Sequence, residues 1–134
     1  MYLSILKEEE KKLFLGFVYY VAASEGNIGD EEKKVIGIYC NEMMIEPVYD
    51  KPELSCIQVV DNISRMATEK EKKIILFEIL GLAMADNRYD KSEKNMIHDA
   101  AKKFGLSDEF VIQCEQTINE YITFQSRLNN LILS

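Results

Sequence analysis

The chain has 134 residues, which is enough for one domain with its own core and too few for two comfortable ones. Its 47% hydrophobic and 29% charged residues are ordinary values for a soluble globular protein. A net charge of −7, from 23 acidic and 16 basic residues, argues against a nucleic-acid binder, because phosphate recognition needs a basic surface.

Apolar residues recur at helical spacing along the chain, whereas the alternating β-branched runs of strands are missing, and glycine (6) and proline (2) are scarce. The spacing predicts helices at about 3–24, 30–45 and 53–66, with Pro47 and Pro52 in the loop before the third. The residues expected to face the core from these helices are Leu6, Leu13, Phe14, Phe17, Val18, Val21, Val35, Ile36, Tyr39, Cys40, Met43, Leu54, Ile57, Val60 and Ile63.

A fourth helix is predicted from the capping-box pattern of Thr68 and Glu71 to about residue 85. It is apolar nearly all round, which is typical of a helix packed on several sides. Glu78 lies within this apolar run. It is either a buried acid or, as we expect, a residue on the one wet edge of the helix.

The fifth helix is expected at about 91–104, with Gly105 as its C-terminal stop, and Ser107 caps a long sixth helix. Buried residues expected in the fifth helix are Met96, Ile97, Ala100, Ala101 and Phe104. The chain is therefore predicted to be all-α, a single-domain bundle of about six to seven helices over 1–134 without an internal linker.

The sixth helix has a distinctive apolar stripe with three-four spacing, close to a heptad pattern and interrupted by Gln125. The stripe consists of Val111, Cys114, Ile118, Tyr121, Leu128 and Ile132. The chain then ends in Leu131, Ile132 and Leu133. Three alternatives are open for this tail: it is an ordinary frayed helix end, it packs on the bundle, or it contacts a partner. A homodimer through this helix is one form of the third alternative.

An internal repeat is the most informative feature of the sequence. Residues 21–36 align with residues 82–97, and the shared pattern predicts two pseudo-symmetric helix-loop-helix units at about 5–45 and 68–106. The identical pairs are Ala22/Ala83, Glu32/Glu93, Lys33/Lys94 and Ile36/Ile97, and positions 25 and 86 are both acidic.

The second acid of each copy has a structural explanation. Asp90 is a predicted N-cap, and Glu93, three residues on, completes a capping box. Gly29 and Glu32 occupy the same positions in the first copy. A capping role alone would account for both glutamates.

The first acid of each copy is harder to explain by local structure. Glu25 and Asp86 follow the end of a helix, where the macrodipole disfavours negative charge by roughly 0.3–1 kcal/mol. An Asx-type turn would suit Asp86, but a glutamate at position 25 does this poorly. A functional and a structural role are both open at these two positions.

These repeated acids carry a resemblance to a known family. Residues 83–93, A-M-A-D-N-R-Y-D-K-S-E, resemble the A-x-A-D-G-x-I-x-x-x-E signature of the TerB-like domains, which include the bacterial tellurite-resistance protein and, more distantly, the N-terminal domain of the DjlA co-chaperone. Asn87 replaces the glycine and Tyr89 the isoleucine. The K-K-F-G-L-S stretch at 102–107 is also similar, and the resemblance extends over about 5–125.

The first copy matches the signature less well. It keeps Gly26, Ile28 and Glu32 but has Ser24 in place of alanine and Glu25 in place of aspartate. These departures weaken the first copy as a metal site more than the second.

The resemblance implies a compact helical domain without enzymatic activity, in which clustered acids bind a divalent cation such as calcium. It also implies a link to tellurite, other chemical stress or phage resistance, alongside membrane-associated partners of the TerC type. Calcium takes six to eight oxygens, and one loop here is too short to wrap the ion as an EF-hand does. The expected weak site therefore pools acids from both loops, namely Glu25, Glu32, Asp86, Asp90 and Glu93.

The second hypothesis is a metal-free interaction or adaptor module, motivated by the sixth helix. Catalysis is not expected, because the only histidine, His98, has no nucleophile in a recognisable pattern, and no phosphate-binding or zinc motif occurs. No catalytic residue and no further cofactor is therefore predicted. The acidic surface also argues against direct binding to anionic lipid.

The expected compartment is the cytoplasm. Cys40, Cys56 and Cys114 form no CxxC pair and are odd in number, which favours free thiols in a reducing environment. The first residues do not have the pattern of a signal peptide. The longest apolar run, 74–85, is interrupted by Glu78 and falls short of the roughly 20 residues that span a bilayer, so no membrane insertion is expected.

Overall fold

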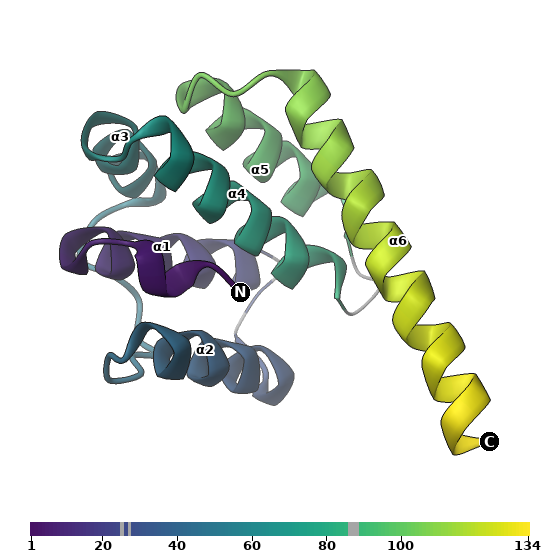
Figure 1. Ribbon diagram of the computed structural model, residues 1–134. Coiled ribbons are helices and arrows are strands. Elements are labelled where there is room, and N and C mark those ends of the chain that lie inside the picture. The colour runs from purple at the N-terminus through teal and green to yellow at the C-terminus, as the bar shows by residue number, and fades with distance from the viewer. Residues whose placement is uncertain (25, 27, 86–88) are drawn as a thin grey trace.

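A computed structural model describes residues 1–24, 26, 28–85 and 89–134. All regular structure in this part of the chain is helical, which confirms the predicted all-α class (Figure 1). In chain order the elements are the 3₁₀ turn η1 (Leu3–Ile5) and the helices α1 (Glu8–Ala22), α2 (Asp30–Met43), α3 (Cys56–Met66), α4 (Glu69–Met84), α5 (Lys91–Lys103) and α6 (Asp108–Leu133).

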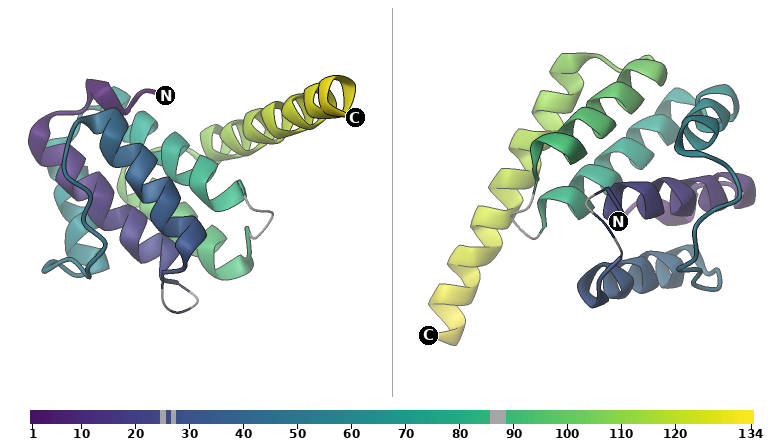
Figure 2. Two further views of the ribbon diagram at one scale, coloured as in Figure 1. Left: turned by 90° about the horizontal axis from the view of Figure 1, so that it is seen from below. Right: turned by 180° about the vertical axis from the view of Figure 1, so that it is seen from behind.

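The helix α1 lies at the centre of the bundle and packs against α2, α3, α4 and α5. Phe14 and Phe17 of α1 are fully buried, and the ring of Phe17 meets that of Phe104 edge-on at a centroid distance of 6.5 Å. The views of Figure 2 show α2 and α4 on different sides of α1. The pairs α1–α2 and α4–α5 are each two helices joined by a short connection, as the sequence repeat predicts.

The first predicted helix is shorter than expected. Instead of one helix over 3–24, the chain forms η1, and α1 begins only at Glu8. Lys7 between them is extended (φ −73°, ψ 159°), and its N–H donates to Oε1 of Glu10 at 2.9 Å. This glutamate cap starts a new helix at a point where apolar spacing alone shows no break.

Several helix ends lie where the capping pattern places them. Thr68 and Glu71 form the predicted capping box of α4, Ser107 caps α6, and Gly105 adopts a positive φ of 76° after α5. The helix α3 begins at Cys56 rather than at about 53, because Ser55 is its N-cap. Ile57 was expected to face the core and is exposed.

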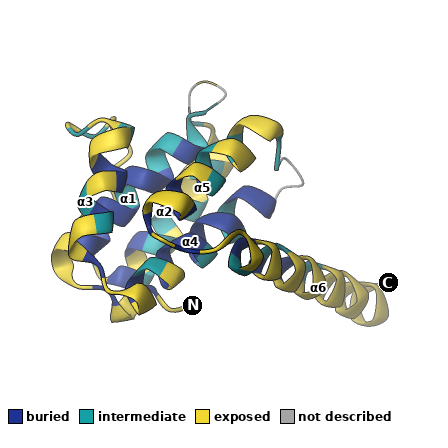
Figure 3. Cartoon of the chain, turned by 90° about the horizontal axis from the view of Figure 1, so that it is seen from above, coloured by how far each residue is buried: buried dark blue, intermediate teal, exposed yellow. Residues whose placement is uncertain are grey.

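The helix α6 extends well beyond the bundle (Figures 1 and 2). Its first turns pack on α4 and α5 through the buried residues Val111, Cys114 and Ile118. From residue 123 onward every residue is exposed, as the continuous yellow of the projecting helix shows in Figure 3. We call residues 121–133 the overhang.

Candidate functional site

Three of the five predicted metal ligands lie in described parts of the structure, in the first turns of α2 and α5 or just before them. Asp90 is the N-cap of α5, and its Oδ1 accepts the N–H of Glu93 at 2.8 Å. Glu32 folds back over the α2 N-cap, since its Oε2 would lie 2.9 Å from a Cβ built on Gly29. The structure thus assigns Asp90 the predicted capping role, through the backbone and not the side chain of Glu93.

The other two predicted ligands, Glu25 and Asp86, lie outside the described residues. Within the described ranges, no three His, Cys, Asp or Glu side chains are arranged to hold a metal ion. The cation site that pools acids from both loops therefore stays a prediction, and so does calcium as the ion that it binds.

A polar cluster next to Asp90 was not predicted from the sequence. The hydroxyl of Tyr89 donates a short hydrogen bond to Oε2 of Glu115 on α6, and Nε2 of His98 lies 3.3 Å from the same oxygen. Burial raises the pKa of Tyr89, and the negative charges of Glu115 and Glu93 raise it further. The phenol therefore keeps its proton and links the second loop to α6.

Sequence reasoning missed this cluster because its members come from distant parts of the chain. Tyr89 was noted only as a departure from the family signature, and His98 as a lone helical histidine. Glu115 follows Cys114 along α6 and has no spacing that relates it to either residue. Only the packing of α5 on α6 brings the three side chains together.

Glu78 is buried, with 5% of its surface exposed, so the expected position on a wet helix edge is wrong. Its carboxylate lies 3.2 Å from the amino group of Met1, which also contacts Glu42 at 2.8 Å. Desolvation raises the pKa of Glu78, and the positive charge of the Met1 amino group opposes this rise. The packing of the N-terminal segment across α4 removes this edge of the helix from water.

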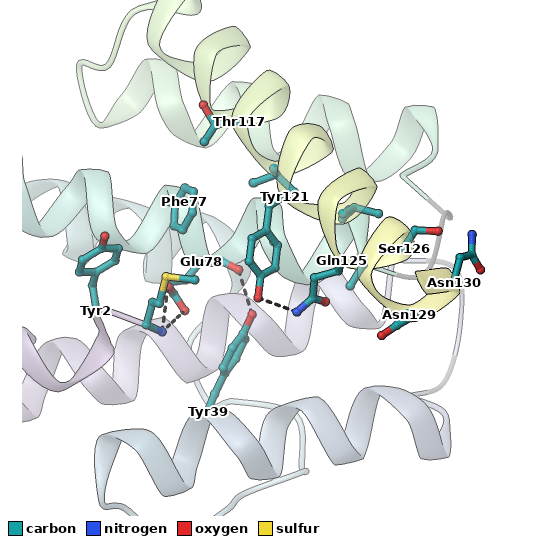
Figure 4. A pocket seen from close by; sticks show the side chains of 15 residues that line it. Tyr2, Tyr39, Phe77, Glu78, Thr117, Tyr121, Gln125, Ser126, Asn129 and Asn130 are labelled. Carbon is teal, nitrogen blue, oxygen red and sulfur yellow. Dashed lines mark hydrogen bonds and ion pairs between the residues drawn. The ribbon is translucent and has the colours of Figure 1, made fainter. Parts of the chain in front are cut away.

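Glu78 lies at the base of a groove of about 840 Å³ between the overhang and the body of the bundle (Figure 4). Tyr39 on α2 donates its hydroxyl to the main-chain carbonyl of Glu78 at 3.0 Å. Tyr121 and Gln125 reach into the groove from α6 and are joined by a 2.9 Å hydrogen bond. The remaining lining residues are Met1, Tyr2, Phe77, Gly81, Ala85, Thr117, Ile118, Ile122, Ser126, Asn129 and Asn130.

The α6 stripe runs from the bundle along the wall of this groove, which Ile118, Tyr121 and Gln125 line, and continues past it to Leu128 and Ile132. Its heptad positions are Val111, Cys114, Ile118, Tyr121, Gln125, Leu128 and Ile132. The first three are buried in the molecule's own core, whereas Tyr121, Leu128 and Ile132 are exposed. The frayed-end and partner alternatives remain, because the tail does not pack on its own bundle.

Other sequence expectations are met in part. The three cysteines are free, and burial raises the pKa of each thiol. Among the helices that the structure describes, none combines the length and the apolar character of a membrane span. The cytoplasmic location stays a prediction.

Comparison with known proteins relates the chain to a family model. The family model described as "Tellurite resistance protein TerB" matches residues 45–116, which is more than half of the chain. The matched region begins just after α2 and runs into α6, and so contains the second of the two aligned copies, 82–97, but not the first, 21–36. No curated protein and no solved structure matches the chain.

Proposed function

The chain belongs to the TerB family, and from this premise we propose that it is a non-catalytic binding domain whose groove under α6 receives a helix of a protein partner. The observation that carries the proposal is the α6 stripe, which is buried in one half and bare in the other. Exposed residues of the overhang include Tyr121, Phe124, Leu128, Leu131, Ile132 and Leu133. Contiguous apolar surface of this kind is typical of an interaction site.

The volume of the groove is comparable to that of a short helical segment. A helix with its side chains is about 10–12 Å wide and has a pitch of about 5.4 Å, so a volume of about 840 Å³ corresponds to between about one and a half and two turns. A groove lined by apolar side chains with amides at its rim suits the apolar face of an amphipathic helix. The membrane-associated TerC-type partner implied by the resemblance stays a prediction.

A partner would also stabilise the overhang. The packed first half of α6 supplies the helix nucleus, but most helix stability in proteins comes from the packing of an apolar face. Residues 123–133 are all exposed and gain nothing from burial in their own bundle. A docked helix would supply that burial.

Site-specific photo-crosslinking in cells tests the proposal. A benzoyl-phenylalanine in place of Gln125, which lines the groove and is exposed on the overhang, is expected to give a discrete protein adduct. The same crosslinker at Ile112, exposed on α6 outside the groove, should give none. Gly81→Phe should abolish the adduct, because Gly81 lines the groove and a Cβ there meets no atom within 4 Å, so the new ring can occupy the groove without a clash at its base.

Adducts of equal yield from both positions, or an adduct at position 125 that persists in Gly81→Phe, would rule out the groove as the binding site. Thermal unfolding of Gly81→Phe provides the folding control. Its midpoint should equal or exceed that of the unmodified chain, since glycine costs about 0.5–1 kcal/mol relative to alanine inside a helix.

Weak divalent-cation binding at the second loop is a second proposed function. It is supported by the acids that gather around Tyr89. The charges of Glu93 and Glu115 both act on its hydroxyl, and Asp90 is adjacent in sequence. Oxygen-rich surroundings of this kind suit a hard cation such as calcium.

Calcium titration followed by amide NMR shifts tests this second function. Millimolar calcium is expected to shift the amides of residues 89–93, and Glu93→Gln should weaken the apparent affinity at least about fivefold by removing one charged ligand. Glu31→Gln, an exposed acid of α2, is the matched control and should leave the affinity unchanged. The absence of any shift at about 10 mM calcium would exclude the site.

A further inference from the structure

We infer that the helix received by the groove is the overhang of a second copy of this chain, so that two copies exchange overhangs about a two-fold axis. The inference rests on the proposed function, because it names the partner of the same groove. The charge and polarity of the overhang, together with its position next to the groove, identify a second copy of the chain as the source of the docked helix.

The charge distribution favours a second copy. The whole chain carries a net charge of −7, and like charges repel two copies that approach through most of their surface. Residues 121–134 contain one charged side chain, Arg127, and no acid. The overhang is therefore a part of the surface where two identical acidic molecules meet without facing acid against acid.

The polar residues of the overhang are also self-complementary. Gln125, Asn129 and Asn130 line the groove, and each amide is both a donor and an acceptor. Groups of this kind pair with their own symmetry mates across a two-fold axis, whereas carboxylates or ammonium groups repel theirs. A basic partner would find no acid in the overhang, and the acid at the base of the groove, Glu78, is already paired with the amino group of Met1. An acidic partner would find only Arg127 in the overhang.

The positions of the overhang and the groove favour a closed dimer. The overhang and the groove lie next to each other on the same molecule, so an overhang that enters the partner's groove places the partner's overhang in its own. An overhang over 121–133 is about 20 Å long at 1.5 Å per residue, which exceeds the roughly two turns to which the groove volume corresponds. The excess length of each helix packs along the other overhang, where Leu128 and Ile132 extend the stripe.

Sedimentation equilibrium of the purified full chain tests the inference. Over about 5–300 μM protein, the unmodified chain is expected to pass from monomer to dimer, because a small reciprocal contact corresponds to a micromolar dissociation constant. Leu128→Asp on the overhang and Gly81→Phe in the groove should each weaken dimerisation about tenfold or more. Ile112→Asp, the same change at an exposed apolar position on the same helix, should leave it unchanged.

Mixing the two weakened variants provides the sharpest result. Leu128→Asp has a damaged overhang and an open groove, whereas Gly81→Phe has an intact overhang and a blocked groove. In a mixture, the overhang of Gly81→Phe can enter the groove of Leu128→Asp, which restores one of the two contacts. The mixture should therefore associate more strongly than either variant alone. Circular dichroism of each variant checks that the bundle stays folded.

A chain that is monomeric at the highest concentration, a dimer insensitive to both variants, or equal loss in Ile112→Asp would overturn the inference. If the purified chain is monomeric while the crosslink at position 125 still yields a groove-dependent adduct, only the identity of the partner is wrong. If the crosslink also fails, the groove is not a docking site and the proposed function is lost with it.

Discussion

Glu10→Gln is expected to stabilise the protein at pH 7 by on the order of 1 kcal/mol, with the gain vanishing as the pH falls toward 4.5. Glu10 is buried, with 1% of its surface exposed, and Glu71 faces it with 6% exposed. Each carboxyl completes a capping box, in which Oε1 of Glu10 accepts the Lys7 N–H at 2.9 Å and Oε1 of Glu71 accepts the Thr68 N–H at 2.8 Å. Two carboxyl groups in this position share one proton.

The proton resides on Glu10. Burial raises the pKa of Glu10 from its ordinary value of 4.5, and hydrogen bonding to the Glu71 carboxylate raises it further. For Glu71, burial opposes ionisation, but hydrogen bonds from Thr68 and Glu10 outweigh it and lower the pKa. Oε2 of Glu10 is buried and has no hydrogen-bond partner in the described structure, a position that a proton donated to the Glu71 carboxylate would satisfy.

The sign of the pH dependence follows from these directions. Because the pKa of Glu10 is higher in the folded state, folding binds a proton above pH 4.5, and stability falls as the pH rises through the folded pKa. The pKa of Glu71 is lower in the folded state, so its contribution is lost as the pH falls below 4.5. In Glu10→Gln the amide still accepts a hydrogen bond from Lys7 and donates one to Glu71, but it does not titrate. The variant therefore does not lose stability as the pH rises.

Urea unfolding from pH 4.5 to 8 measures this effect. The exposed neighbour variant Glu9→Gln is the control and should run parallel to the unmodified chain. Glu71→Ala should cost about 2–3 kcal/mol, because it removes the capping box of α4 and the acceptor for Glu10. A Glu10→Gln variant that is less stable than the unmodified chain at pH 7 would contradict the shared proton.

Much of the fold could be predicted from the sequence, because short-range patterns decide it. Thr68, Ser107 and Gly105 mark helix ends through local chemistry, and apolar spacing identified core residues such as Phe17 and Ile97. The split between η1 and α1 was missed, since the Glu10 cap at Lys7 lies inside a continuous helical pattern.

The features around the groove could not be predicted, because they depend on tertiary packing. The apolar neighbours of Glu78 in the sequence are compatible with a buried acid and with an acid on a wet helix edge. Glu78 is buried because the N-terminal segment lies across α4. The pairing of Tyr89 with Glu115 likewise requires the packing of α5 on α6. Whether an α6 residue lies inside or outside the bundle depends on where the bundle ends, which the uninterrupted stripe does not reveal.

Amide hydrogen exchange of the overhang at two protein concentrations tests the central claim most directly. At about 5 μM the amides of residues 123–133 are expected to exchange nearly as fast as in an unfolded chain, and at about 300 μM at least tenfold more slowly, because a docked helix then covers them. Amides of α1 should exchange equally slowly at both concentrations. Gly81→Phe, a change on α4, should remove the dependence on concentration. Exchange of the overhang that is the same at both concentrations, whether fast or slow, would contradict the claim that a second copy covers it.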